Sequence, residues 1–128
     1  INESIHENIT SLVGVPSWML VLLHKVLERT GKDNLLEVWP NLEVYFHGGV
    51  NFTPYKEQYK KLIPKKSFKY YETYNASEGF FAQQDRNCSL DLLLMLDYGI
   101  FYEFIPMKTY RGENSTTLPL SEVKKGEN

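Results

Sequence analysis

A glycine pair follows an alternating apolar segment of the chain. Gly48 and Gly49 lack side chains, so their backbone can approach a flat ligand closely or adopt positive φ. His47 ends the alternating segment beside them, and loops held by rigid elements often carry binding residues, so we expect His47 to line a pocket. For two glycines alone, an ordinary structural turn is the favoured interpretation.

The stretch YNASEGFF, residues 74–81, carries more varied chemistry. Tyr74 could stack on a heteroaromatic ring, and Ser77 could donate a hydrogen bond to a phosphate oxygen. Glu78 could hold a magnesium ion that itself binds phosphates, because this ion commonly takes only one or two protein carboxylates. The alternative is a plain turn with a solvated acid.

Apolar periodicity indicates the elements that position these residues. We expect a short buried strand at 9–15 and a helix at 17–30, which Gly31 ends. Because apolar residues nearly encircle the first half of this helix, we expect that half to be covered on most sides. In residues 42–47, Leu, Val and Phe alternate with Glu, Tyr and His, which is the period of a strand. Thr53 and Pro54 read as the start of a second helix that runs to Pro64.

A third strand is expected at 69–74, ending where the quoted stretch begins. Residues 90–96 and 100–106 are further strand candidates, and a short turn between them predicts a hairpin. We assign 1–107 to one α/β piece. The polar composition of 108–128 indicates a loop or tail.

This order of elements predicts an α/β fold with a parallel βαβαβ core and an added antiparallel hairpin. Ligands of such sheets bind beyond the carboxyl ends of the strands. The loops expected there are 15–17, 47–50 and 75–79. The glycine pair and the quoted stretch would therefore share one binding rim.

Composition limits the function classes. With 128 residues, 42% of them apolar, the chain can bury a core, and its net charge of −2 with dispersed lysines gives no nucleic-acid stripe. The single cysteine, Cys88, excludes an internal disulfide and has no neighbouring base, so we expect no nucleophile there. We also expect no signal peptide or membrane span, and a cytoplasmic location.

Four ordered blocks of the chain resemble a known family. They cover roughly residues 9–107 and resemble the plant auxin-responsive promoter family of acyl acid-amido synthetases and its bacterial relatives, which are adenylate-forming enzymes. The blocks are TSLVGVPSWMLVLLHKVLERTG, EVYFHGGVNFTPYKEQYKKLIP, YYETYNASEGFFAQQ and YGIFYEFIPM. The Gly-Gly-small turn and the Tyr-x-x-Ser/Thr-Glu turn of that superfamily match His47 to Val50 and Tyr74 to Glu78.

The resemblance implies an enzyme that activates a carboxylic acid with ATP and magnesium and passes the acyl group to an amine such as an amino acid. It also implies roles for individual residues. Nucleotide contacts would come from Gly48, Gly49, Val50, Tyr74 and Ser77, the magnesium ligand would be Glu78, and the acyl side would be lined by His47, Phe80 and Phe81. Ser77 and Glu78 would be the catalytic residues.

The chain departs from the family pattern in several places. The Ser/Thr/Gly-rich phosphate loop, the later Tyr-Arg-x-Gly-Asp-like segment and the mobile carboxyl-terminal domain are missing, and residues 110–113 do not replace that segment. We therefore expect a central fragment of the large N-terminal domain, inactive without the remaining parts of the parent enzyme. A non-catalytic nucleotide- or acyl-binding module and a purely structural α/β domain remain alternatives.

Overall fold

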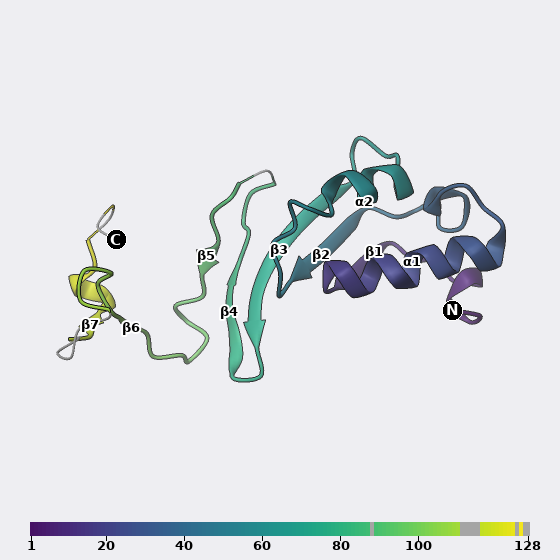
Figure 1. Cartoon of the computed structure of the whole chain (residues 1–128). Helices are drawn as coiled ribbons and strands as arrows, with labels where there is room; N and C mark the ends of the chain where they lie inside the picture. The colour runs from purple at the N-terminus through teal and green to yellow at the C-terminus, as the bar shows by residue number, and fades with distance from the viewer. Residues whose placement is uncertain (88, 111–115, 125, 127–128) are drawn as a thin grey trace. The chain divides into compact units, whose positions relative to one another are not determined.

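The computed structural model describes residues 1–87, 89–110, 116–124 and 126 (Figure 1). Cys88 and the residues 111–113 lie outside this part of the chain. The chain forms two compact units, Ile1–Met95 and Leu96–Asn128. The predicted extent of the α/β piece, residues 1–107, concerned the parent enzyme and stays a prediction.

The first unit contains one mixed sheet with the strand order β1-β2-β3-β4-β5. The first three strands are mutually parallel, and β4 and β5 add antiparallel to the β3 edge. The strands are β1 (Ser11–Gly14), β2 (Val44–Gly48), β3 (Lys69–Ala76), β4 (Gly79–Gln83) and β5 (Leu93–Leu94). The predicted α/β fold with a parallel βαβαβ core is therefore confirmed as an architecture.

Two helices connect the parallel strands. α1 spans Pro16–Thr30, with its proline in the first turn and Gly31 in the left-handed region at φ 66°, where its N–H donates to the carbonyl of Leu27. α2 spans Lys56–Leu62. It begins later than predicted, because Thr53 lies in a turn whose N–H donates to the Asn51 side chain.

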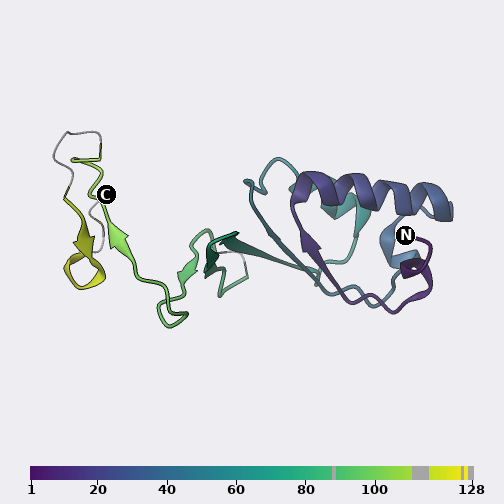
Figure 2. The same cartoon turned by 90° about the horizontal axis from the view of Figure 1, so that it is seen from below.

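One face of the sheet carries both helices and the core. Leu23 and Val26 of α1 and Tyr59 of α2 belong to one buried cluster with Tyr45 of β2, and both helices lie on the same side of the parallel strands in Figure 2. Val13 on the opposite face is 72% exposed. The helix-covered face therefore holds the packing energy of this unit.

The front half of α1 is less covered than its composition predicted. Trp18 is 77% exposed and Val21 54% exposed, while Leu20 and Leu23 are buried. The apolar residues of this helix thus form one buried face and one exposed face, and the expectation of cover on most sides was wrong.

The third predicted loop is a hairpin turn. β3 continues to Ala76 and β4 begins at Gly79, so only Ser77 and Glu78 remain between the strands. The register shifts between Tyr74 and Asn75, which marks a bulge. The sequence prediction missed β4 because its apolar run is short and directly follows turn-forming residues.

The hairpin predicted from residues 90–106 is not formed in the described structure. β5 pairs with β4, while β6 (Glu103–Phe104) pairs with β7 (Leu118–Pro119) in the second unit. The predicted tail therefore contains a strand, and it is followed by the short 3-10 helix η3 (Leu120–Glu122). The alternation of apolar and polar residues predicted extended strands correctly. It does not specify which strand each of them pairs with.

Two further 3-10 helices complete the first unit, η1 (Ser4–His6) and η2 (Leu35–Glu37). Trp39, just after η2, donates its indole N–H to the carbonyl of Ser4 at 2.9 Å, which ties the start of the chain to the core. Within the described ranges, every helix is too short or too polar to cross a lipid bilayer.

Candidate functional site

The glycine pair ends β2 in a crowded place. A Cβ atom on Gly48 would lie 2.3 Å from the carbonyl oxygen of Thr73, its register partner on β3, so no larger residue fits without movement. Gly49 has φ 81°, and a Cβ atom there would lie 3.5 Å from Val15 in the loop after β1. The loops after β1 and β2 therefore meet, and the fold itself requires both glycines.

His47 is buried beside the pair. Its ring is 3% exposed and stacks on Phe52 with 4.0 Å between centroids. Burial lowers the pKa of His47 to about 4, so the imidazole is neutral at pH 7. Its Nδ1 has no hydrogen-bond partner within the described part of the chain. The neutral ring could supply one hydrogen bond to a ligand, but not a positive charge.

The Tyr74–Glu78 segment is solvated. Tyr74 is 57% exposed, and its ring lies against that of Phe81 with 5.2 Å between centroids. Ser77 donates to the Glu78 carboxylate at 3.2 Å, and both residues are exposed. The serine hydroxyl and the carboxylate thus lie together at the tip of the hairpin, open to a ligand.

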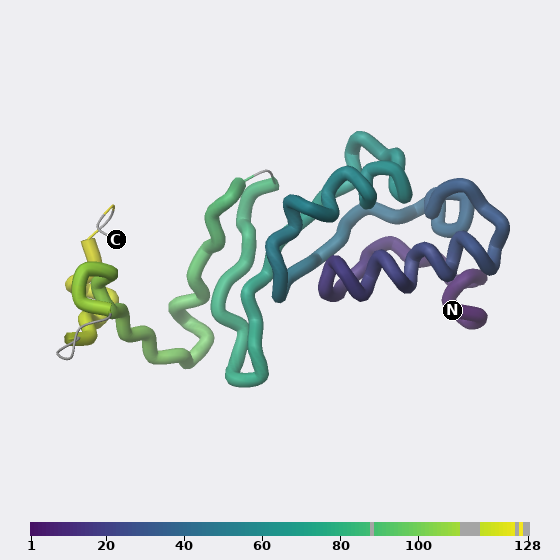
Figure 3. The backbone as a smooth tube through the Cα atoms, viewed as in Figure 1, coloured from purple at the N-terminus to yellow at the C-terminus, as the bar shows by residue number. Residues whose placement is uncertain are grey.

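The structure brings some of the predicted residues together and separates others. The register pairs Gly48 with Thr73, so Tyr74 lies next to the glycine pair. Ser77 follows Thr73 by four residues, which places the hairpin tip on the order of 10 Å further along the strand. Figure 3 shows the hairpin extending beyond the end of β2. Ser77 and Glu78 are therefore on the same rim but not beside the glycines.

The remaining predicted residues surround these two groups. Val50 follows the glycines and is 39% exposed. Phe80 and Phe81 lie in β4, half-buried. Their positions beside the hairpin tip and beside Tyr74 agree with a rim location, and their contact with an acyl group stays a prediction.

Two buried tyrosines, which the sequence prediction missed, form hydrogen bonds to the backbone at the loop after β1. Tyr45 donates to the carbonyl of Gly14 at 2.8 Å, and Tyr59 donates to that of Pro16 at 2.9 Å. The two hydroxyl oxygens are 3.2 Å apart, and burial raises the pKa of both. The periodicity of apolar residues predicts that these rings face the core. It does not predict which carbonyl groups accept hydrogen bonds from the two hydroxyls.

The described residues contain no group of three His, Cys, Asp or Glu side chains that could enclose a metal ion. Glu78 offers one exposed carboxylate, which suits a magnesium ion whose other ligands are phosphate oxygens and water. A single carboxylate of this kind fits an ion that arrives with a nucleotide.

The chain was also compared with known proteins. No curated protein and no solved structure matched it. Residues 1–68 match the model of the GH3 family N-terminal domain, and this range includes the glycine pair but ends before Tyr74. Because the match covers more than half of the 128 residues, the chain belongs to the GH3 family, the auxin-responsive acyl acid amido synthetases.

Proposed function

We propose that this chain supplies part of the nucleotide-binding rim of an ATP-dependent acyl acid amido synthetase. The enzyme would join a carboxylic acid to ATP as an acyl-adenylate, with release of pyrophosphate, and transfer the acyl group to an amine such as an amino acid. The observation that carries the proposal is the family match over 1–68, which includes the glycine pair. Gly48 of this pair is in register with Thr73, the residue just before the Tyr74–Glu78 segment.

Each rim residue has a role that its position allows. Gly48, Gly49 and Val50 would pass along the adenine and the acyl group, and the exposed ring of Tyr74 would stack on the adenine. The distance from there to the hairpin tip suits an extended nucleotide, whose phosphates would reach Ser77 and Glu78. Phe80 and Phe81 would border the acyl side.

The chemistry makes the hairpin tip important. When the carboxylate oxygen attacks the α-phosphorus, the bond to pyrophosphate breaks and negative charge builds on the phosphoryl oxygens. Magnesium, when bound, stabilises this charge. In the structure the Ser77 hydroxyl donates to Glu78. Rotation of that hydroxyl toward a phosphate oxygen would free the Glu78 carboxylate to bind magnesium.

The missing phosphate loop suggests that activity belongs to a longer protein, of which this chain is one part. The test is pyrophosphate exchange into ATP by the whole enzyme with magnesium and a panel of carboxylic acids. We expect exchange that depends on one acid or a few. Absence of exchange with every acid in the panel would contradict an adenylating function.

The same missing loop favours a second candidate for the chain alone, a nucleotide- or acyl-binding module without catalysis. Calorimetric titration of the chain with AMP separates this candidate from a purely structural domain. Heat of binding that is lost on Tyr74→Ala would support the module, and no binding of AMP would exclude nucleotide recognition by the isolated chain.

A further inference from the structure

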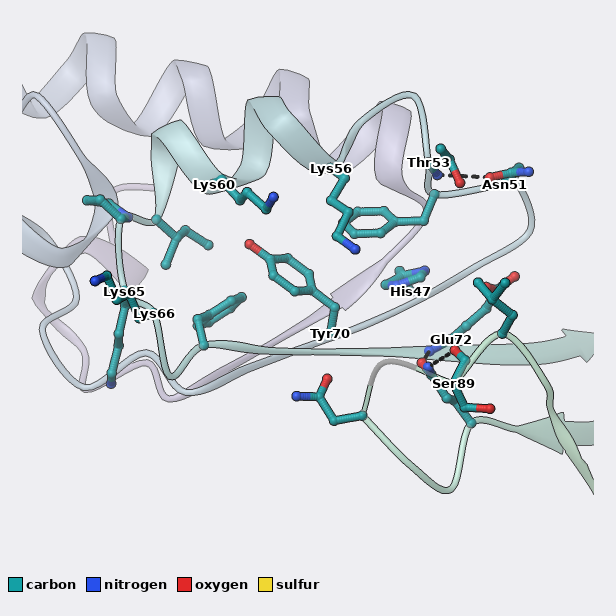
Figure 4. Close-up of a pocket in the computed structure, with 17 residues that line it drawn as sticks. His47, Asn51, Thr53, Lys56, Lys60, Lys65, Lys66, Tyr70, Glu72 and Ser89 are labelled. Atoms are coloured by element: carbon teal, nitrogen blue, oxygen red, sulfur yellow. Dashed lines mark hydrogen bonds between the residues drawn. The ribbon is translucent and has the colours of Figure 1, made fainter.

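A large open cavity lies apart from the proposed nucleotide rim. It encloses about 960 Å³ within the first unit, in the size range of small-molecule sites. Its walls are α2 with the segment after it, the helix-covered side of β3, the loop after β2, and residues of the segment after β4 (Figure 4). Of the predicted site residues, His47 lines the cavity, whereas the residues proposed to contact the nucleotide do not.

Positive charge dominates the cavity wall. The lining includes the four lysines Lys56, Lys60, Lys65 and Lys66, and one carboxylate, Glu72. Lys56 and Lys60 reach from α2 into the cavity over Tyr70 (Figure 4). A cleft lined mainly by one sign of charge concentrates counter-ions of the other sign, so this wall favours an anion.

Lys56 and Lys60 are available for a ligand. Lys60 pairs with Glu57 at 2.7 Å, but both side chains are largely exposed, and such pairs are easily exchanged. Within the described residues, Lys56 has no carboxylate within 4.0 Å. Lys65 is already engaged, because its Nζ donates to the carbonyl of Leu42.

The floor of the cavity is aromatic. Tyr70 lies at its centre, with ring centroids 5.1 Å from those of Phe52 and of Phe68. The hydroxyl of Tyr70 is buried and has no hydrogen-bond partner in the described structure. Burial raises the pKa of Tyr70 to about 12, so the hydroxyl keeps its proton at pH 7 and can donate it. Unpaired buried polar groups are uncommon and often mark a missing water or ligand.

We propose that this cavity binds a small organic anion, whose flat apolar body covers the aromatic floor and whose phosphate or carboxylate is held by Lys56, Lys60 and the hydroxyl of Tyr70. The charged group would receive two ammonium contacts and one hydroxyl donor. The floor would supply apolar contact, which inorganic phosphate alone cannot use.

The probe is 1-naphthyl phosphate, with 1-naphthoate, 1-naphthol and inorganic phosphate as comparisons, titrated into the ¹⁵N-labelled chain at pH 7.5 and low salt without ATP. We expect both aryl anions to bind more tightly than naphthol or inorganic phosphate. Amide shifts should change along 56–63 and 68–72 and not at 74–79. No binding of either aryl anion, or shifts confined to other segments, would overturn the proposal.

Two lysine variants distinguish specific binding in the cavity from non-specific binding of the anion to lysines elsewhere. Lys56→Ala should weaken naphthyl phosphate about tenfold, because charge-assisted hydrogen bonds are strong. Lys32→Ala removes the same charge from an exposed position that does not line the cavity, and should change the affinity less than twofold. Equal weakening by both variants would show non-specific binding and overturn the proposal.

Tyr70→Phe is the sharpest variant. It keeps the ring and removes a hydroxyl that has no partner in the described structure, so the folded state should lose no stability. We expect the affinity for naphthyl phosphate to fall about fivefold, as for the loss of one hydrogen bond to a charged group. Unchanged affinity would contradict the role of the hydroxyl and with it the proposed placement of the anion.

Discussion

The two ends of the proposed nucleotide rim differ in what holds them. The glycine end is buried and fixed by strand register, with Gly48 against Thr73 and His47 against Phe52. The hairpin tip is exposed, and there the Ser77 hydroxyl donates a hydrogen bond to the Glu78 carboxylate. The fold therefore explains the glycines without any ligand, whereas the exposed serine and carboxylate at the tip suit a plain turn as well as a ligand.

This difference separates tests of the fold from tests of the function. Substitutions at the glycine end should change stability whether or not a nucleotide binds. Substitutions at the tip should leave stability unchanged, so a loss of activity there would report on chemistry.

Gly48→Ala should have the largest effect. Its Cβ would lie 2.3 Å from the carbonyl oxygen of Thr73, so β2 and β3 must separate locally. We expect a loss on the order of 3 kcal/mol in the free energy of unfolding, measured by urea titration of the chain. Gly31→Ala is the comparison without a clash: a Cβ there meets open space, so only its φ of 66° should cost stability, by about 1 kcal/mol. A cost no larger than that of Gly31→Ala would show that the β2–β3 approach is looser than described.

His47 should make the stability of the chain depend on pH. Burial lowers its pKa from 6.5 to about 4, so the unfolded chain binds a proton first as the pH falls. Stability is therefore complete above pH 6.5 and declines toward pH 4, by up to about 3 kcal/mol. Urea titrations across this range should show a shallower decline for His47→Gln. Parallel curves for the two proteins would mean that His47 is accessible to protons in the folded state.

Gly49→Ala should cost less than Gly48→Ala. The residue has φ 81°, which an L-residue adopts at a cost of about 1 kcal/mol, but its Cβ would be in ordinary contact with Val15. The free energy of unfolding tests this directly. A loss as large as that for Gly48→Ala would indicate that the loop after β1 presses on the glycine pair more tightly than the structure shows.

The elements that local pattern defines could be predicted from the sequence. The proline start and glycine stop of α1 and the alternation of β2 each use a signal within a few residues, and both elements were found. β4 was missed, and β6 pairs with β7 rather than with β5. These failures share a cause, because strand pairing is decided by packing between distant segments.

The same limit applies to the site. Residue types predicted a rim with glycines, a tyrosine and a carboxylate, and register placed Tyr74 beside the glycines. The extension of the hairpin, the tyrosine pair under the loop after β1 and the lysine-lined cavity depend on long-range contacts. For example, Tyr59 meets the carbonyl of Pro16 across 43 positions of sequence. No spacing rule predicts such a contact.

Glu78→Gln in the whole enzyme tests whether the carboxylate at the hairpin tip takes part in adenylation. We expect an unfolding free energy within about 0.5 kcal/mol of the parent, since Glu78 is exposed. We also expect acid-dependent pyrophosphate exchange to fall about a hundredfold, because the proposed magnesium ligand is lost. Exchange at the parent rate in a correctly folded Glu78→Gln enzyme would show that the tip carboxylate has no part in the reaction.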